Sequence, residues 1–206
     1  MTTYLDEILA DIDWRVSELA IIKSMPIKYG FKPEHKDIYV KYSVPAIYAI
    51  WEGFIKNCFV IYSNHLNSLS IKRVEVAPAL LTHQIDAICD FNNPRQSFDS
   101  KLKLVEQIDD LLQDVIVITP KVPTESNVNL KVLNKILERF CIIKMDMTHG
   151  KGLDKLLRFR NTIAHGENSL IVNMIHVTEF VTIVENLMLD IAINIDACEK
   201  LKSYKR

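Results

Sequence analysis

The sequence predicts an all-α fold, and three observations support this class. Apolar residues make up 49% of the 206-residue chain and charged residues 25%, a balance typical of globular rather than disordered proteins. Only 5 glycines and 7 prolines occur, too few for an all-β chain that needs frequent turns. Apolar residues also recur at the three-four spacing of amphipathic helices. No boundary divides the chain, so we expect one domain over residues 1–206.

The N-terminal part is predicted to form two long helices. Over residues 4 to about 23, apolar side chains fall on a single stripe, which indicates a helix with one buried face. The two prolines and the glycine of residues 26–33 are expected to end it. Residues 34–67 are apolar around nearly the whole circumference, which predicts a central helix packed on several sides, with a kink at Pro45.

Shorter helices are predicted in the middle of the chain. The apolar spacing indicates helices over residues 76–89 and 98–113, separated by the turn-forming sequence FNNPRQS. Residues 115–123 are β-branched and end in prolines. This composition is compatible with a short strand, but we interpret the segment as an extended crossover.

The last part of the chain carries clear helix start and stop signals. Either Asn129 or Asn127 is expected to cap a helix that continues to about residue 140. The THGKG sequence is predicted to be a loop, followed by a helix over residues 152–165 that Gly166 ends in the C′ position. A final helix is expected over residues 176–202, with a basic tail that frays from about residue 203.

Charge and cysteine content exclude several classes of protein. The net charge of −1 excludes a generally basic nucleic-acid coat, although a local basic patch stays compatible with it. The 4 cysteines lie far apart without a Cys-x-x-Cys pair, which favours reduced, buried thiols over structural zinc. The acidic N-terminus is not a signal peptide, and no stretch of about eighteen uncharged apolar residues occurs. We therefore expect a cytoplasmic protein without membrane partner, metal or cofactor.

A cluster of polar residues marks the helix predicted over residues 152–165. On a helical wheel the side opposite the apolar arc carries four of them: Arg158, Asn161, Thr162 and His165. Positions three, four and seven apart share a helix face, so Arg158, Asn161 and His165 are within reach of one another. Thr162 is expected to support this group.

Arg160 stands apart from that cluster, because the wheel places it within the apolar arc. A guanidinium at such a position needs a buried anion, and Glu52 in the apolar central helix needs a cation. We therefore expect Glu52 to support the site by pairing with Arg160. If the helix unwinds into 3₁₀ geometry near its end, Arg160 turns outward instead.

These residue types suit metal-independent cleavage of RNA. Histidine titrates near neutrality and can take a proton from a ribose 2′-hydroxyl, while arginine binds phosphate and stabilises charge on its oxygens. Asparagine can orient the imidazole or a phosphate oxygen. DNA lacks the internal nucleophile and usually requires metal, for which the sequence shows no carboxylate cluster. The competing interpretation is a solvated helix end at which His165 and Arg158 interact with the helix dipole.

The stretch RNTIAHG resembles the signature of the HEPN superfamily, an Arg-x4-6-His motif with a polar residue directly after the arginine. The matching residues are Arg160, Asn161 and His165, and Arg158 fits the looser spacing. AHGENS and SNVNLKVLNKILERF are similar to the prokaryotic toxin and defence branch, the RiboL-PSP and MAE-type domains. The resemblance implies a single HEPN-like helical bundle with a long central helix and extra short helices. Its pattern assigns Arg160 as the functional arginine, whereas the wheel favours Arg158.

The same resemblance implies a metal-independent endoribonuclease of a toxin–antitoxin or abortive-infection system. Such a protein is a homodimer whose two motif helices face each other, so that both histidines line one RNA-binding cleft. An antitoxin or another defence protein is the implied partner. In one branch of the superfamily, a tyrosine two residues after the histidine is the target of modification. This chain has Glu167 at that position, so we expect no control by modification there.

Two further residues and two other interpretations complete the sequence-based hypotheses. His149 and Lys151 precede the motif helix and are candidates for contacting RNA phosphate, with a solvated loop as the alternative. The second functional hypothesis is a catalytically inactive HEPN module that binds a partner protein or a nucleotide. A purely structural helical adaptor is the third.

Overall fold

The fold is described by a computed structural model that covers residues 3–88, 97–113, 115–124, 127–167 and 169–206. Over these ranges it contains α-helices, two 3₁₀ turns and isolated β-bridges but no strand, which confirms the all-α prediction. In chain order the helices are α1 (Tyr4–Lys28), α2 (Pro33–Ser68), α3 (Pro78–Ile88), α4 (Phe98–Gln113), α5 (Leu130–Arg139), α6 (Gly150–Ala164) and α7 (Met174–Leu201). The predicted Cys89 end of the third helix and most of the turn after it lie outside the described residues.

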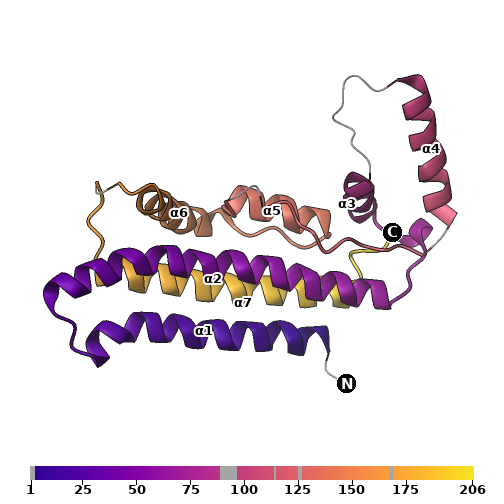
Figure 1. Cartoon of the computed structure of the whole chain (residues 1–206). Coiled ribbons are helices and arrows are strands. Elements are labelled where there is room, and N and C mark those ends of the chain that lie inside the picture. The colour runs from indigo at the N-terminus through magenta and orange to yellow at the C-terminus, as the bar shows by residue number, and fades with distance from the viewer. Residues whose placement is uncertain (1–2, 89–96, 114, 125–126, 168) are drawn as a thin grey trace.

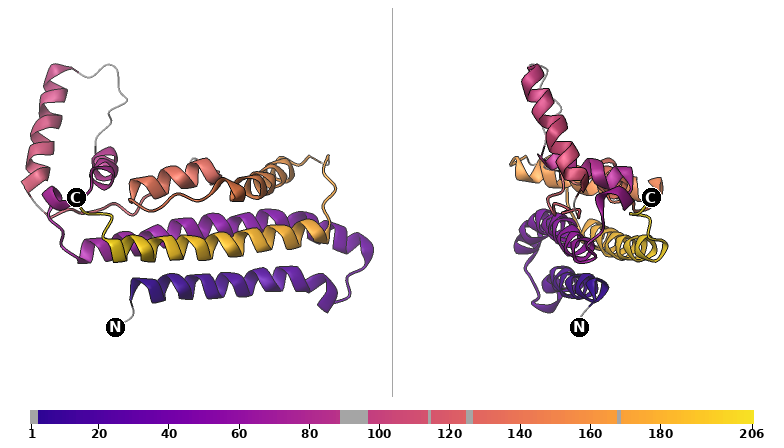
Figure 2. Two further views of the ribbon diagram at one scale, coloured as in Figure 1. Left: turned by 180° about the vertical axis from the view of Figure 1, so that it is seen from behind. Right: turned by 90° about the vertical axis from the view of Figure 1, so that its right-hand side faces the viewer.

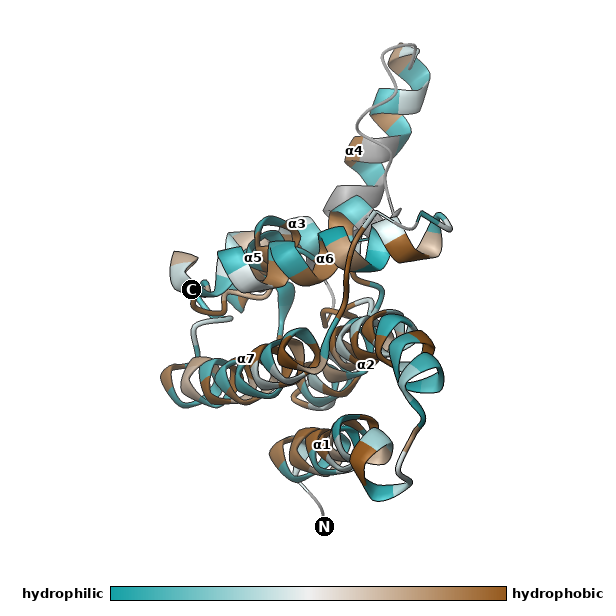
Figure 3. Cartoon of the chain, turned by 90° about the vertical axis from the view of Figure 1, so that its left-hand side faces the viewer, coloured by the Kyte–Doolittle hydropathy of each residue, from teal (hydrophilic) through white to brown (hydrophobic). Residues whose placement is uncertain are grey.

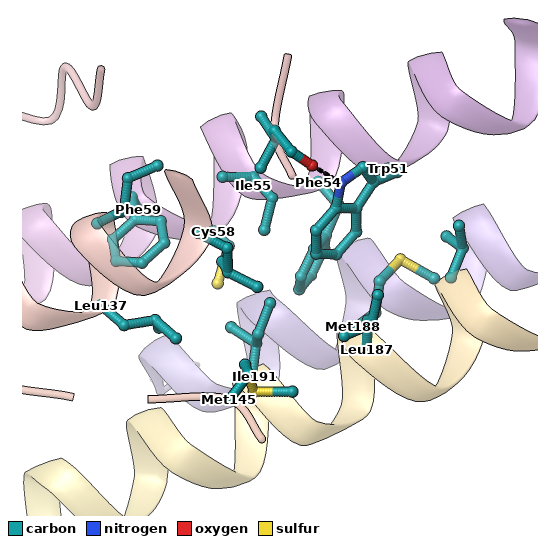
Figure 4. Close-up of a cluster of buried hydrophobic side chains, with 14 of the residues drawn as sticks. Trp51, Phe54, Ile55, Cys58, Phe59, Leu137, Met145, Leu187, Met188 and Ile191 are labelled. Atoms are coloured by element: carbon teal, nitrogen blue, oxygen red, sulfur yellow. Dashed lines mark hydrogen bonds between the residues drawn. The ribbon is translucent and has the colours of Figure 1, made fainter. Parts of the chain in front are cut away.

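Three long helices form the base of the molecule (Figures 1 and 2). α2 and α7 lie side by side, α1 packs along both of them, and α5 and α6 cover the opposite side. Within the base, Trp51, Phe54 and Phe59 of α2 are completely buried, and Figure 4 shows this face of α2 packed against Leu187 and Ile191 of α7. Full burial of one such side chain contributes about 1.5–3 kcal/mol. The long central helix that the sequence predicted is therefore α2.

The predicted end of the first helix is wrong, because α1 continues through Pro26 to Lys28. Pro26 lacks an N–H and leaves the carbonyl of Ile22 without its helical donor. The hydroxyl of Tyr39 in α2 donates to that carbonyl at 3.0 Å and replaces the missing bond. α2 also continues through Pro45.

The C-terminal tail is not frayed, contrary to the prediction. Tyr204 is 2% exposed, and its hydroxyl donates to Glu199 Oε1 at 3.1 Å. Arg206 donates its backbone N–H to the carbonyl of Glu75 and its Nε to the carbonyl of Val76. These bonds to a distant segment hold the tail against the bundle.

The segments around α5 and α6 agree with the sequence in part. The extended crossover is confirmed, with one bridge between Lys72 and Val115, and Asn129 caps α5 by accepting from the N–H of Val132 at 2.8 Å. The loop predicted for THGKG is wrong. Residues Met147–His149 form a 3₁₀ turn, and α6 begins directly after it.

Among the described helices, α2 is the one long and apolar enough to cross a membrane by length and composition. Half of its most apolar 18-residue window is buried inside the molecule. Core helices pass the same test, and the contacts of α2 with α1, α6 and α7 account for its apolar circumference.

Candidate functional site

The C-terminal end of α6 carries the predicted cluster, and its geometry is set by Gly166. The N–H of Gly166 donates to the carbonyl of Ile163 at 3.0 Å, and that of Glu167 donates to the carbonyl of Thr162 at 3.1 Å. This pair of bonds is a Schellman motif, and Gly166 supplies the positive φ of 76° that it requires. The helix therefore keeps α geometry through Ala164, and His165 is its C-cap.

Arg160 points from α6 toward α2, as the helical wheel predicts, and it does not turn outward. Its Cζ lies 4.6 Å from the centroid of the buried Tyr48 ring, a cation–π contact. Its Nη1 donates to Asn161 Oδ1 at 2.7 Å and to Asn127 Oδ1 at 3.3 Å. Arg160 is thus half-buried and held by groups from α2, from α6 and from the residues just before α5.

The expected ion pair between Glu52 and Arg160 does not form. Glu52 instead accepts from Lys56 Nζ at 2.7 Å, one helical turn along α2. The two predicted partners approach the same side chain, Tyr48, whose hydroxyl accepts from the N–H of Val128 at 2.9 Å. Burial raises the pKa of Tyr48, and the neighbouring Glu52 carboxylate raises it further. Neutral amide and phenol groups around Arg160 thus replace the buried anion that the sequence suggested.

The opposite face of α6 is open to solvent. Arg158 and His165 are exposed, and Asn161 and Thr162 are half-buried between them and the core. Within the described part of the chain, neither Arg158 nor His165 has a hydrogen-bonded or ion-paired side-chain partner; Arg158 Cζ lies 5.6 Å from the Phe159 ring centroid. Asn161 joins the two sets of residues, because its amide contacts Arg160 while its position is one turn before His165.

A comparison with family models identifies the family of this helical chain. Residues 4–204 match the model described as MAE_28990-like HEPN. The chain belongs to this HEPN family. No curated protein and no solved structure matches it. The family and the all-helical bundle that the motif implied are therefore confirmed.

Two predicted RNA-contacting residues of the HEPN chain lie far from the motif. His149 and Lys151 stand at the N-terminal end of α6, sixteen and fourteen positions before His165. At 1.5 Å rise per residue, this separates them from His165 by about 21–24 Å. His149 Nε2 also lies 3.5 Å from Asp190 Oδ2 in α7, while Lys151 is exposed. The structure thus does not bring them to the same site in one chain.

Sequence reasoning missed two side chains that contact Arg160, Tyr48 and Asn127. Tyr48 lies in a helix that is apolar throughout, so the sequence does not mark it as different from core residues. Asn127 is predicted only as an alternative helix cap. Their contact with Arg160 joins segments more than thirty residues apart, which no local pattern indicates. One sequence signal for Asn127 is that it lies two residues before Asn129. Only one of the two asparagines is needed to cap the helix, so the other is available for a different contact. No group of three or more metal-ligating side chains occurs among the described residues.

Proposed function

We propose that this HEPN protein is a metal-independent endoribonuclease whose site combines the α6 ends of two copies of the chain. The observation that supports this function is the open face of α6. It presents an exposed histidine and an exposed arginine about two turns apart, backed by a second arginine held in place. Unpaired polar groups on one face are free to bind a ligand.

In the proposed reaction, the ribose O2′ attacks the adjacent phosphorus. His165 of one copy accepts the 2′-hydroxyl proton, and His165 of the second copy donates a proton to the departing O5′. The P–O5′ bond breaks, which leaves a 2′,3′-cyclic phosphate and a free 5′-hydroxyl. Arg158 neutralises charge on the non-bridging oxygens, as arginines do at phosphoryl centres.

Arg160 and Asn161 take a positioning role in this proposal. The bond from Arg160 Nη1 to Asn161 Oδ1 occupies the oxygen of the amide and leaves its NH₂ group to donate. An asparagine fixed in this orientation can direct that donor toward the imidazole or toward phosphate. Tyr48 and Asn127 then support the reaction by holding Arg160.

The first experiment tests the chemistry with purified full-length protein, total RNA and tRNA in excess EDTA. Wild type is compared with His165→Ala and with His149→Ala, a control at the histidine that precedes the other end of the same helix. We expect EDTA-insensitive cleavage by wild type and the control but not by His165→Ala, with cyclic phosphate at the product ends. An oligonucleotide with a 2′-deoxy sugar at the cleaved position should resist cleavage.

Three results would contradict the proposal. If His165→Ala still cleaves RNA, His165 is not a catalytic residue. No cleavage by a folded dimer would favour the inactive HEPN module that binds a partner protein or nucleotide. Light scattering tests the dimer directly, since a fully active monomer is incompatible with a composite site.

A toxin or antiphage role follows from the same proposal and has its own readout. Expression of the wild type should arrest growth of the host cell, and His165→Ala should not. Recovery of growth on co-expression of a neighbouring gene product would identify the antitoxin or defence partner. Equal growth of cells that express wild type and cells that express His165→Ala would contradict the toxin role. It would not contradict the proposed RNA cleavage.

A further inference from the structure

A basic and aromatic surface lies at the end of the bundle nearest His165. The turn between α1 and α2 and the connection from α6 to α7 lie at this same end (Figures 1 and 2). The first turns of α2 contact this connection, since Lys41 Nζ donates to the carbonyl of Glu167 at 3.4 Å, two residues after His165. We name this surface the corner and define it by six residues: Lys28, Tyr29, Lys32, Lys36, Lys41 and Tyr42.

The corner concentrates positive charge in a chain that is nearly neutral overall. Residues 23–42 contain five lysines and two carboxylates, whereas the whole chain has a net charge of −1. Lys28, Lys32 and Lys36 are exposed. Local charge of this kind attracts a polyanion even when net charge does not, because binding depends on the phosphates neutralised where the two molecules meet.

Exposed aromatic rings accompany these lysines. Tyr29 is 64% exposed and Tyr42 60% exposed, unusual values for large rings that otherwise favour burial. Lys28 Nζ lies 5.7 Å from the Tyr29 ring centroid, and Lys41 Nζ lies 6.0 Å from that of Tyr42. A ring beside a cation is the combination that binds unpaired nucleotides, through base stacking and phosphate contact together.

A groove beside the corner adds an apolar surface. Its volume is about 540 Å³, within the range of small-ligand pockets. Phe31 and Val40 line one wall and Met174 and Ile175 the other, while Lys36 and Asp37 add one positive and one negative charge. Figure 3 views this end of the chain and shows hydrophobic and hydrophilic stretches next to each other along the α1–α2 turn. The groove is thus suited to a flat ring attached to a charged backbone.

We propose that the corner binds a single-stranded stretch of RNA that flanks the cleaved phosphate. Lys32 and Lys36 contact its phosphates, one base enters the groove that Lys36 also lines, and a base farther along the strand stacks on Tyr42. From Lys32 to Lys41 the corner extends about 14 Å along α2, at 1.5 Å per residue, and it wraps around the helix, because positions nine apart lie on opposite sides of it. Lys41 connects the corner to the His165 end. This inference rests on the proposed ribonuclease function, for which it names unpaired RNA as the substrate class.

The test measures RNA binding separately from cleavage. Full-length His165→Ala protein is titrated with a fluorescein-labelled unpaired RNA oligonucleotide and with the same sequence as a duplex, by anisotropy at several salt concentrations. Lys32→Glu/Lys36→Glu and Tyr42→Ala are added to this background. The matched control is Lys101→Glu/Lys103→Glu, the same charge change at two exposed lysines on α4.

We expect preference for the single strand over the duplex. Tyr42→Ala should weaken binding roughly 5- to 150-fold, the effect of removing one base–aromatic stack. The Lys32/Lys36 double variant should bind more weakly still. Its affinity should also depend less steeply on salt, by about 0.7 in the log–log slope for each phosphate that is no longer neutralised, whereas the α4 control should bind like the parent. In the wild-type background, the corner variants should raise KM for RNA more than they lower kcat.

Three results would overturn the inference. The first is equal RNA binding by the corner variants and the α4 control, and the second is equal binding of single strand and duplex. The third is a change of oligomeric state on Tyr42→Ala without loss of RNA affinity, which would make the corner a protein interface. Failure of the ribonuclease proposal is distinguishable, because wild type would then cleave nothing while corner-dependent binding by His165→Ala persisted.

Discussion

The two ends of α6 each carry a histidine, but the polar side chains have partners at one end and none at the other. At the N-terminal end, Asp146 accepts from the N–H of Thr148 at 2.8 Å, and His149 lies 3.5 Å from Asp190. At the C-terminal end, Arg158 and His165 are exposed, and within the described ranges no side chain pairs with either. Both ends belong to one rigid helix, so the difference lies in the partners supplied by other elements.

This contrast separates polar groups that build the structure from groups that remain available. A hydrogen-bonded or ion-paired side chain must break those bonds before it can bind a ligand, and removing it lowers the free energy of unfolding. An exposed, unpaired side chain contributes little to stability, so its substitution leaves the fold intact. Under the proposed function, the C-terminal end of α6 binds and cleaves RNA and the N-terminal end supports the fold, and the following substitutions test this division.

The largest expected difference is between His165→Ala and His149→Ala in RNA cleavage. General acid–base catalysis contributes roughly 100- to 10,000-fold, so His165→Ala should lower kcat by that range, whereas His149→Ala should cleave like wild type. Initial rates with one defined RNA substrate in EDTA measure both. An equal loss of cleavage rate in the two variants would contradict the difference between the two ends of α6 and would make His149 a candidate site residue again.

The next difference is between the two arginines near the C-terminal end. Arg160→Ala leaves Asn127 and Asn161 without their shared donor and removes the cation–π contact with Tyr48, so the free energy of unfolding should fall by about 1–3 kcal/mol. Arg158→Ala touches no such network and should change stability by less than about 0.5 kcal/mol.

Urea denaturation followed by circular dichroism measures these stabilities, and cleavage assays on the same samples complete the test. Arg158→Ala should lose activity while it stays fully folded. If Arg158→Ala is destabilised and Arg160→Ala is not, the interpretation of the two arginines is wrong.

Local features of this fold were predictable from sequence because their chemistry is local. The Asn129 cap, the end of α6 at Gly166 and the bounds of α4 depend on residues within one turn of each other. The Glu52–Lys56 pair was also available as an i,i+4 pattern, although a longer-range partner was expected.

The remaining features depend on contacts between distant segments. α1 continues past Pro26 because Tyr39 supplies a donor from the next helix, and the tail is ordered because residues 75 and 76 accept its hydrogen bonds. The surroundings of Arg160 come from three separate elements. A motif therefore locates the candidate residues, while the packing of α2 against α6 decides which arginine is held and which is open.

A third test compares the glycines at the two ends of α6. Gly166 has φ +76°, where the left-handed conformation costs an alanine about 1–2 kcal/mol. Gly150 has ordinary helical φ, where alanine gains roughly 0.5–1 kcal/mol in helix propensity. Its Cβ would stand 3.1 Å from Leu130 Cδ2, a close approach that offsets this gain.

We therefore expect Gly166→Ala to lower the thermal midpoint and Gly150→Ala to leave it near wild type. Calorimetry on both variants checks the order. A Gly150→Ala protein less stable than Gly166→Ala would show that packing at the N-terminal end, and not backbone conformation at the C-terminal end, limits α6.

The smallest expected effect concerns acid and the carboxylate cap of the N-terminal end. The bond from the N–H of Thr148 lowers the pKa of Asp146 below its ordinary value of 3.8. A carboxyl whose pKa is lower in the folded state stabilises the fold above its unfolded pKa, and this contribution is lost as the pH falls through the folded pKa. Asp146→Asn should therefore be slightly less stable than wild type at pH 7, with the difference shrinking toward pH 3. Urea midpoints at both values measure it. A gap that widens in acid would show that Asp146 is not the anchor of this end, and the contrast between the two ends of α6 would then rest on His149 and Asp190 alone.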